Sequence, residues 1–377
     1  MYDLNDFAVP YSTLQRGCRD QDILDAANRC LQADPANYFC GYHPYHGWFV
    51  GQRCRDPENG ESLGVLVLKD SDGGTIVPAM SVHASSAFSI GTSHSVCQDY
   101  ARVRPWSRDC GITAVAVSDG CSSSADTDIG ARSLTLAALE QLRLTSCARL
   151  DNASIAHVLN GAFQTSSGAC SLIGQYALDA TLLLASKQED VNFVHVQLFG
   201  DGAVVVKRRD GDLVVHEVSA AGGAPAYLSY RLHDNRFRMF VKETNGAVST
   251  VRTYVNGELV VTWTAPFTRD PSGDDPLFAG NRTAAALTGI EMDIPVSRTE
   301  LVMVASDGLA SFQKTTGMSP VPVDVCTVAR HLADVKSPAG DFMSRRLRAF
   351  EKKTCRSEGW EHYDDLAVAA LYLEVSR

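Results

Sequence analysis

The sequence predicts a layered α+β fold in which antiparallel strands and helices form separate layers. From Phe88 onward, short apolar strands follow one another in runs, and the strong turns between them carry Asp-Gly or Asn-Gly. Segments with apolar residues at helical spacing come in pairs and do not alternate with single strands. Because a parallel sheet is built from alternating strand and helix units, we expect mostly antiparallel pairing.

Length and composition are those of a globular protein with a sizeable core. The 377 residues suffice for one large domain with additions or for two ordinary domains, and 45% of them are hydrophobic. The 44 acidic residues outnumber the 34 basic ones, and the net charge of −10 argues against general binding to nucleic acid or to an anionic membrane. No apolar run is long enough to span a membrane as a helix, and the N-terminus lacks a signal-peptide pattern, so we expect a cytoplasmic protein. The 11 cysteines are scattered, as expected of reduced thiols.

Residues 1–80 are predicted to be an N-terminal extension or embellishment, and residues 81–377 the main domain. A short helix at residues 22–32 and a strand at residues 64–70 are expected in the extension. The inward positions of that helix are Ile23, Leu24, Ala27 and Leu31. A cluster of zinc-binding residue types matches no familiar zinc motif, so we interpret it as local aromatic packing; it consists of Cys40, His43, His46 and Cys54.

Within the main domain we expect a strand at residues 111–118, which ends at Asp119, followed by two helices at residues 128–142 and 154–163. The second helix has one apolar face, formed by Ile155, Val158, Leu159, Ala162 and Phe163. A strand at residues 178–186 comes next.

The segment 193–218 is predicted to form an antiparallel meander of three strands joined by two turns that contain Asp. Its first strand shows period-two alternation, with Val194, Val196 and Leu198 on one face and His195 and Gln197 on the other. Asn-Gly pairs at residues 245–246 and 256–257 predict two further hairpins.

The C-terminal third is predicted to hold a strand up to Ala305, two helices at residues 325–335 and 341–353, and a last strand at residues 366–375. Five basic residues crowd the second helix. We interpret them as a solvated face, with Phe342, Met343, Leu347 and Phe350 turned inward.

Acidic residues stand at the ends of five of these strands. A single aspartate in a turn needs no function, because it caps its own backbone. If the strands form two facing sheets, however, their ends could converge on one cleft, and several carboxylates held close together cannot all stay ionised without cations. Mg²⁺ or Mn²⁺ suits such a site, whereas zinc would require His and Cys ligands. The acids are Asp99, Asp119, Asp201, Asp307 and the pair Asp364 and Asp365.

The order of these motifs resembles the metal-dependent protein phosphatases of the protein phosphatase 2C type. The resemblance runs from about Phe88 to the C-terminus, through GTSHSVCQDYARV, AVAVSDGCSSSADTDIGAR, LDATLLLAS, LFGDGAVVV, ELVMVASDGLASF and YDDLAVAALYL. The first motif ends in Cys-Gln-Asp, as in the bacterial-type branch. The resemblance implies a β-sandwich of two antiparallel sheets flanked by helix pairs, in α-β-β-α layers.

The resemblance also implies a role for each acid. Asp119 matches the acid that bridges two metal ions, and the carbonyl of Gly120 matches the backbone ligand beside it. Asp307 and Asp364 match acids that hold one of these ions from the later strands. Asp99 matches an acid of the first motif, which holds the ion pair mainly through bound water.

The resemblance covers two further acids. Asp201 matches the aspartate of a Gly-Asp-Ser turn, where it can help Asp307 to bind a weaker third ion. Asp365 occupies the position of the family's usual asparagine, so either Asp364 or Asp365 could be the metal ligand.

The activity that the resemblance implies is hydrolysis of phosphoserine and phosphothreonine in proteins. Two Mg²⁺ or Mn²⁺ ions about 3.5 to 4 Å apart lower the pKa of a shared water and orient it in line with the phosphorus. Two departures from the family stand out: His94 replaces an arginine that grips the phosphate, so Arg102 or Arg104 could serve instead, and Cys121 replaces a histidine of the animal enzymes.

Two alternatives remain open on the sequence. The replacements at His94 and Cys121 would also suit a catalytically weak or inactive module that binds a phosphorylated partner or a regulatory ligand. A hydrolase of small phosphoesters or nucleotides is the other alternative, although the chain has no P-loop, no dinucleotide glycine fingerprint and no Gly-x-Ser-x-Gly motif. Residues 220–280 are the expected source of specificity. The oligomeric state is not indicated.

Overall fold

A computed structural model provides the coordinates of the chain. It describes residues 80–105, 110–169, 173–189, 191–220, 248–266, 289–316 and 319–375, with 223, 225–232, 236, 239, 240 and 242 between them. Before residue 80 it describes residues 27, 28, 31 and 32 and the backbone of four strands.

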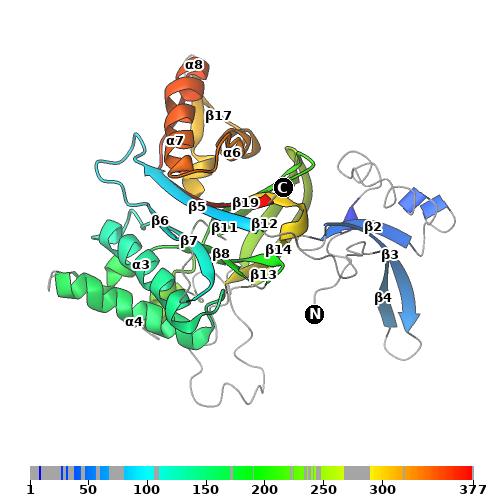
Figure 1. Ribbon diagram of the computed structural model, residues 1–377, viewed down its shortest axis with the longest axis horizontal. Coiled ribbons are helices and arrows are strands. Elements are labelled where there is room, and N and C mark those ends of the chain that lie inside the picture. Colours follow the sequence, from blue (N-terminus) through cyan, green and yellow to red (C-terminus); the bar gives the residue numbers. More distant parts are fainter. Residues whose placement is uncertain are drawn as a thin grey trace.

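Two antiparallel sheets form the body of the molecule (Figure 1). The first has seven strands in the order β13-β12-β11-β10-β15-β19-β5 and the second has five, in the order β14-β9-β8-β7-β6. The bounds of the first are β5 Met80–Ser89, β10 Gly202–Arg208, β11 Leu213–Ala220, β12 Val248–Val255, β13 Glu258–Pro266, β15 Thr299–Ala305 and β19 Leu366–Val375. Those of the second are β6 Tyr100–Arg104, β7 Ile112–Ser118, β8 Leu182–Gln188, β9 Phe193–Phe199 and β14 Ile290–Pro295.

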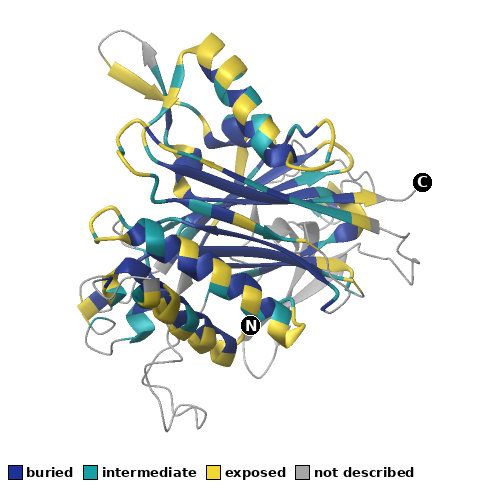
Figure 2. Ribbon diagram, turned by 60° about the vertical axis from the view of Figure 1, so that its left-hand side comes forward, coloured by how far each residue is buried: buried dark blue, intermediate teal, exposed yellow. Residues whose placement is uncertain are grey.

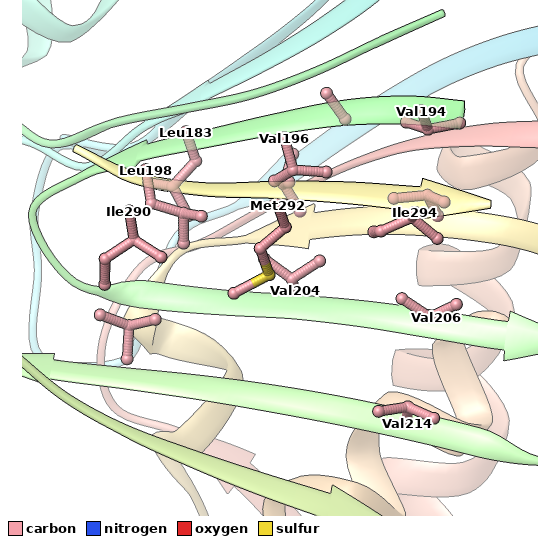
Figure 3. Packing of buried hydrophobic residues seen from close by; sticks show 14 of the residues in the cluster. Leu183, Val194, Val196, Leu198, Val204, Val206, Val214, Ile290, Met292 and Ile294 are labelled. Carbon is pink, nitrogen blue, oxygen red and sulfur yellow. The ribbon is translucent and has the colours of Figure 1, made fainter. Parts of the chain in front are cut away.

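The core between the sheets follows from the alternation of apolar side chains along these strands. Val194, Val196 and Leu198 of β9 point into this interior, where they lie opposite Val204 and Val206 of β10 (Figure 3). All five side chains are buried. Complete burial of a valine or leucine side chain contributes about 1.5 to 3 kcal/mol, so this interior is a main source of stability.

Each outer face of the sandwich carries a pair of helices (Figure 2). Helices α3 (Thr127–Thr145) and α4 (Asn152–Ala169) share a core with the five-stranded sheet. Helices α6 (Val325–Ala333) and α7 (Phe342–Ala349) share one with the seven-stranded sheet. Helix α7 continues into a wider turn at Phe350–Cys355 and a short helix α8 at Arg356–Glu358. The predicted α-β-β-α layers are confirmed, and Phe342, Met343, Leu347 and Phe350 are buried as expected.

The predicted meander over residues 193–218 is wrong in one respect. Strands β9 and β10 belong to different sheets, since β9 pairs with β8 and β14 while β10 pairs with β11 and β15. The turn between them instead carries the chain from one sheet to the other. Gly200 and Gly202 have φ angles of 106° and 132°, which side-chain-bearing residues rarely adopt. Period-two alternation therefore identified the strands but not the sheet to which each belongs.

The structure also tests the predicted hairpins and the predicted apolar face of the second helix. The hairpin at Asn256 and Gly257 is confirmed, with φ angles of 54° and 94° at these positions between β12 and β13. The pair at 245–246 lies outside the described residues. Phe163 is 38% exposed and does not join the buried face of α4.

Two minor sheets complete the fold. One is formed by β16 (Phe312–Thr316), β17 (Ser319–Pro322) and β18 (Trp360–His362). The other lies to the side of the body in Figure 1 and consists of β1 (Ala8–Val9), β2 (Tyr38–His43), β3 (Gly47–Asp56) and β4 (Gly60–Val67). In the extension, Ala27 and Leu31 pack toward the core between the main sheets, as predicted. The side chains of Cys40, His43, His46 and Cys54 lie outside the described residues, and the boundary at residue 80 stays a prediction.

No helix among the described residues is long and apolar enough to cross a membrane. Among the same residues the cysteines are free thiols: Cys97, Cys110, Cys121, Cys147, Cys326 and Cys355.

Candidate metal centre

The turn that carries Asp119 is mounted on the residues that precede β8. The Asp119 amide donates to Thr181 Oγ1 at 3.0 Å, and the Thr181 amide donates to the Asp119 carbonyl at 2.8 Å. Gly120 pairs with Ala180 in an isolated antiparallel bridge. A Cβ on Gly120 would come within 2.9 Å of Thr127 in α3, so this position favours glycine. Strand, helix and the turn before β8 therefore together hold the Asp119 backbone.

Asp119 lies between two other acids. Its carboxylate contacts those of Asp99 and Asp307, although the three residues belong to three separate motifs. Asp99 directly precedes β6, whereas Asp307 follows β15 in the opposite sheet. Burial, and then the charges of both neighbours, raise the pKa of Asp119 well above its ordinary value. The ends of strands from both sheets thus converge, as the sequence predicts.

Asp99 is almost completely buried, with 1% of its surface exposed. Burial raises the pKa of Asp99 to about 7, while contacts with Asp119 and Ser306 act in the opposite direction. Its Oδ2 atom is buried and has no hydrogen-bond partner in the described part of the protein. A buried carboxylate oxygen without a partner is costly, and a cation would satisfy it.

Asp201 and Asp364 lie around the same centre. Burial raises the pKa of Asp201 to about 7, and the negative charges of Asp307 and Asp364 add to the effect. The pKa of Asp364 is also raised, by burial and by the charge of Asp307. Asp201 occupies the turn that passes between the two sheets, so the centre receives an acid from that connection too.

Asp365 has a different environment from Asp364. It is 1% exposed, and its two carboxylate oxygens accept hydrogen bonds from the amides of Gly91, at 2.8 Å, and Gln98, at 2.6 Å. Both amides belong to the loop between β5 and β6. Asp365 therefore holds this loop in place. Asp364, in contrast, interacts electrostatically with Asp201 and Asp307.

His94 lies in the same loop, beside the acidic pair. Its Nδ1 atom stands 3.0 Å from Asp365 Oδ2 and 3.7 Å from Asp364 Oδ1. The two alternative cations point to other partners: Arg102 donates to the Tyr100 hydroxyl at 3.2 Å, and Arg104 lies 3.7 Å from Glu140 in α3. Of the three, His94 is thus the one that the structure places next to the acids.

The oxygen atoms of these acids are chemically suited to bind hard divalent cations. Carboxylate oxygens that contact one another, with one of them unpartnered and buried, are the ligands that Mg²⁺ and Mn²⁺ prefer. Among the described residues, no three His, Cys, Asp or Glu side chains stand around a single point as a finished ligand set. The acids instead meet in contacts such as that of Asp119 with Asp99 and with Asp307.

Sequence reasoning missed the residues that support the acids. Ser306 is fully buried, its hydroxyl accepts from the Ala367 amide at 3.0 Å, and it also contacts Asp99. Thr181 and Asp179 support the Asp119 turn from the start of β8. Their positions in the sequence were the available signal. Each of these polar residues stands directly beside an apolar strand, within one of the motifs quoted above.

Comparison with known proteins gives a match to one family. The family model described as protein phosphatase 2C matches residues 90–350. This range includes the acids Asp99, Asp119, Asp201 and Asp307 and ends before Asp364. No curated protein sequence matches the chain.

Several solved structures are similar at low identity. The phosphatase domain, with a fragment of the regulatory domain, of SpoIIE from Bacillus subtilis is 11% identical with a TM-score of 0.42, over 94% of this chain and 75% of that chain. A serine/threonine phosphatase from S. agalactiae is 13% identical with a TM-score of 0.40, over 78% and 100% of the two chains. The catalytic domain of the serine/threonine phosphatase PstP, in complex with two manganese ions, is 12% identical with a TM-score of 0.35, over 78% and 100%.

Proposed function

Since the chain belongs to the protein phosphatase 2C family, we propose that it is a metal-dependent phosphatase that hydrolyses phosphoserine and phosphothreonine in proteins. The observation that carries this proposal is the contact of Asp119 with Asp99 and Asp307, which brings acids from both sheets to one centre. A cluster of this charge is unfavourable by itself, and divalent cations would offset it.

The residues proposed to hold Mg²⁺ or Mn²⁺ follow from their positions. Asp119 lies centrally and would bridge two ions, with the Gly120 carbonyl beside it. Asp307 and Asp364 would contribute from the seven-stranded sheet, and Asp99 would contribute from the five-stranded sheet. When bound, two such ions supply an acidified water as nucleophile and positive charge opposite the phosphoryl oxygens.

The remaining residues near the centre are proposed to have supporting roles that follow from where they lie. Asp201, near Asp307 and Asp364, is proposed to help hold a third, weaker ion. Asp365 would not be a ligand, because it holds the loop of residues 91–98 through the Gly91 and Gln98 amides. That loop presents His94 at the centre, where its imidazole would donate a hydrogen bond to a phosphate oxygen.

The test is phosphate release by the purified full chain with Mn²⁺ and a phosphothreonine peptide. Turnover that requires Mn²⁺ and is abolished by excess chelator is the expected result. No release at high protein concentration would overturn the proposal. A small phosphoester assayed in parallel at equal concentration tests the substrate class, and a much larger kcat/KM for it than for the peptide would contradict action on proteins.

A second candidate function is a catalytically inactive module that binds phosphorylated partners. His94 beside Asp365 favours it, since the side chain at the phosphate position is an imidazole next to a carboxylate and not a free guanidinium. Under this alternative the chain would bind the phosphothreonine peptide and Mn²⁺, as measured by calorimetry, and release no phosphate. Such a result would replace the phosphatase proposal.

A further inference from the structure

Asp179 stands at the junction between the metal centre and the connection from β11 to β12. Its backbone carbonyl accepts a hydrogen bond from the Cys121 amide at 2.8 Å, two residues after Asp119. The next residues, Ala180 and Thr181, pair with Gly120 and Asp119. Residues 179–181 therefore form the support on which the Asp119 turn lies.

The Asp179 carboxylate is 3% exposed and joins this support to two other parts of the chain. Ser124, in the loop after the Asp119 turn, donates to Oδ2 at 3.0 Å. Ser229 donates to Oδ1 at 2.6 Å, from the short helical turn Leu228–Leu232 between β11 and β12. Arg236, in the same connection, donates through both terminal nitrogens, at 3.0 Å to Oδ1 and 2.7 Å to Oδ2.

Arg236 is held in place by aromatic rings as well. Its guanidinium lies 4.5 Å from the ring centroid of Tyr176 and 5.0 Å from that of Tyr230. The same connection reaches the Asp119 turn at a second point, since the Tyr227 hydroxyl contacts the Cys121 thiol. Two independent contacts thus tie this connection to the residues that flank Asp119.

We propose that Asp179 is a positioning residue for the Asp119 turn, held by Ser229 and Arg236, so that the seating of the β11–β12 connection sets the affinity of the centre for divalent metal. This inference rests on the proposed function. The Asp179 carboxylate accepts four hydrogen bonds, two of them from one guanidinium, so it has little freedom. Its backbone carbonyl passes this order to Cys121, and the next residue, Ala180, passes it to Gly120.

The experiment compares Mn²⁺ binding by isothermal calorimetry in full-length variants. Asp179→Asn combined with Arg236→Gln removes both charges together, so no buried charge is left unpaired. Arg236→Lys keeps the charge and loses the two-pronged contact. The matched control combines Lys207→Gln with Glu300→Gln, a pair 2.8 Å apart that joins β10 to β15.

We expect the Asp179 and Arg236 double variant to bind Mn²⁺ with a Kd about tenfold or more above wild type, and Arg236→Lys to give a smaller increase. The control pair should leave the Kd unchanged. Near-ultraviolet circular dichroism establishes that each variant is folded. A wild-type Kd in the folded double variant, or in Arg236→Lys if the double variant does not fold, would overturn the inference. Failure of the wild type to bind Mn²⁺ would instead overturn the proposed function, and this inference with it.

Discussion

Gly308 packs against Asp365 so closely that a Cβ atom on Gly308 would stand 1.8 Å from the Asp365 carbonyl oxygen. Gly91 packs against the neighbouring residue, where its Cβ would lie 2.3 Å from the Asp364 carbonyl. Two glycines therefore pack tightly against the backbone that carries the acidic pair. One of them follows Asp307 and the other begins the loop that carries His94.

Gly308→Ala should destabilise the protein and weaken the metal centre. The methyl group must displace the Asp365 backbone, and overpacking of this kind costs about 1 to 3 kcal/mol. Urea denaturation measures the loss, and Mn²⁺ calorimetry measures the effect on the centre. Gly174→Ala is the matched control, because a Cβ there meets no atom within 4 Å. Equal stability of the two variants would contradict the packing argument.

Asp119→Asn should lower the rate of Mn²⁺-dependent phosphate release by several orders of magnitude. It should leave the fold of the metal-free protein intact. The metal-free variant should be at least as stable as wild type, because the change removes a negative charge that contacts Asp99 and Asp307. Mn²⁺ should no longer raise its Tm. Asp341→Asn, at the exposed start of α7, is the control and should behave as wild type. Full activity of Asp119→Asn would remove Asp119 from the proposed centre.

His94→Arg should lower the KM for a phosphothreonine peptide. A guanidinium is always charged and grips phosphate with two donors, whereas an imidazole can turn only one ring nitrogen toward it. Steady-state kinetics at saturating Mn²⁺ provide the measurement, and His83→Arg, at the exposed edge strand β5, is the control. An unchanged KM would mean that His94 does not reach the phosphate.

The burial of His216 should lower the free energy of unfolding of the protein as the pH falls below 6.5. It is buried in β11, 2.9 Å from Thr253 Oγ1, and burial, with the charge of Arg208, lowers the pKa of His216 from 6.5 to about 4. Because the unfolded chain binds a proton below pH 6.5 and the folded protein does not, stability falls from pH 6.5 toward pH 4. The loss approaches about 3 kcal/mol.

Urea denaturation of wild type and His216→Gln between pH 7 and pH 4.5 checks this expectation. The variant should be less stable at pH 7, where it loses a packed side chain, and should lose less further stability on acidification. His83→Gln should follow the wild-type profile. Parallel profiles for wild type and His216→Gln would show that His216 does not govern the acid sensitivity.

Local patterns predicted most of the fold, because strand alternation and helical periodicity are properties of neighbouring residues. They could not assign β9 and β10 to different sheets, since a strand's partner is set by distant segments and the Gly200 turn suits a hairpin equally well. The apolar spacing likewise assigned Phe163 to the buried face of α4, but that face runs through Ala162 and Ser166, and Phe163 lies beside it at the surface.

The sequence indicates the acids of the proposed centre because each stands at a strand end, but it does not indicate which role each acid has. Asp364 and Asp365 are adjacent in sequence, and only the amides of Gly91 and Gln98 distinguish them. The role of Asp179 is not readable from its motif, since its partner Arg236 comes 57 residues later. Pairings across such separations depend on the folded arrangement.

The position of Asp119 on one sheet and of Asp307 on the other has a mechanical consequence. A cation bound by both residues would link the two sheets at one end of the sandwich. The sheets could then separate there only if the cation dissociated. Amide hydrogen exchange in β7 and β15 should then slow together when Mn²⁺ is added, and strands at the far ends of both sheets should respond far less.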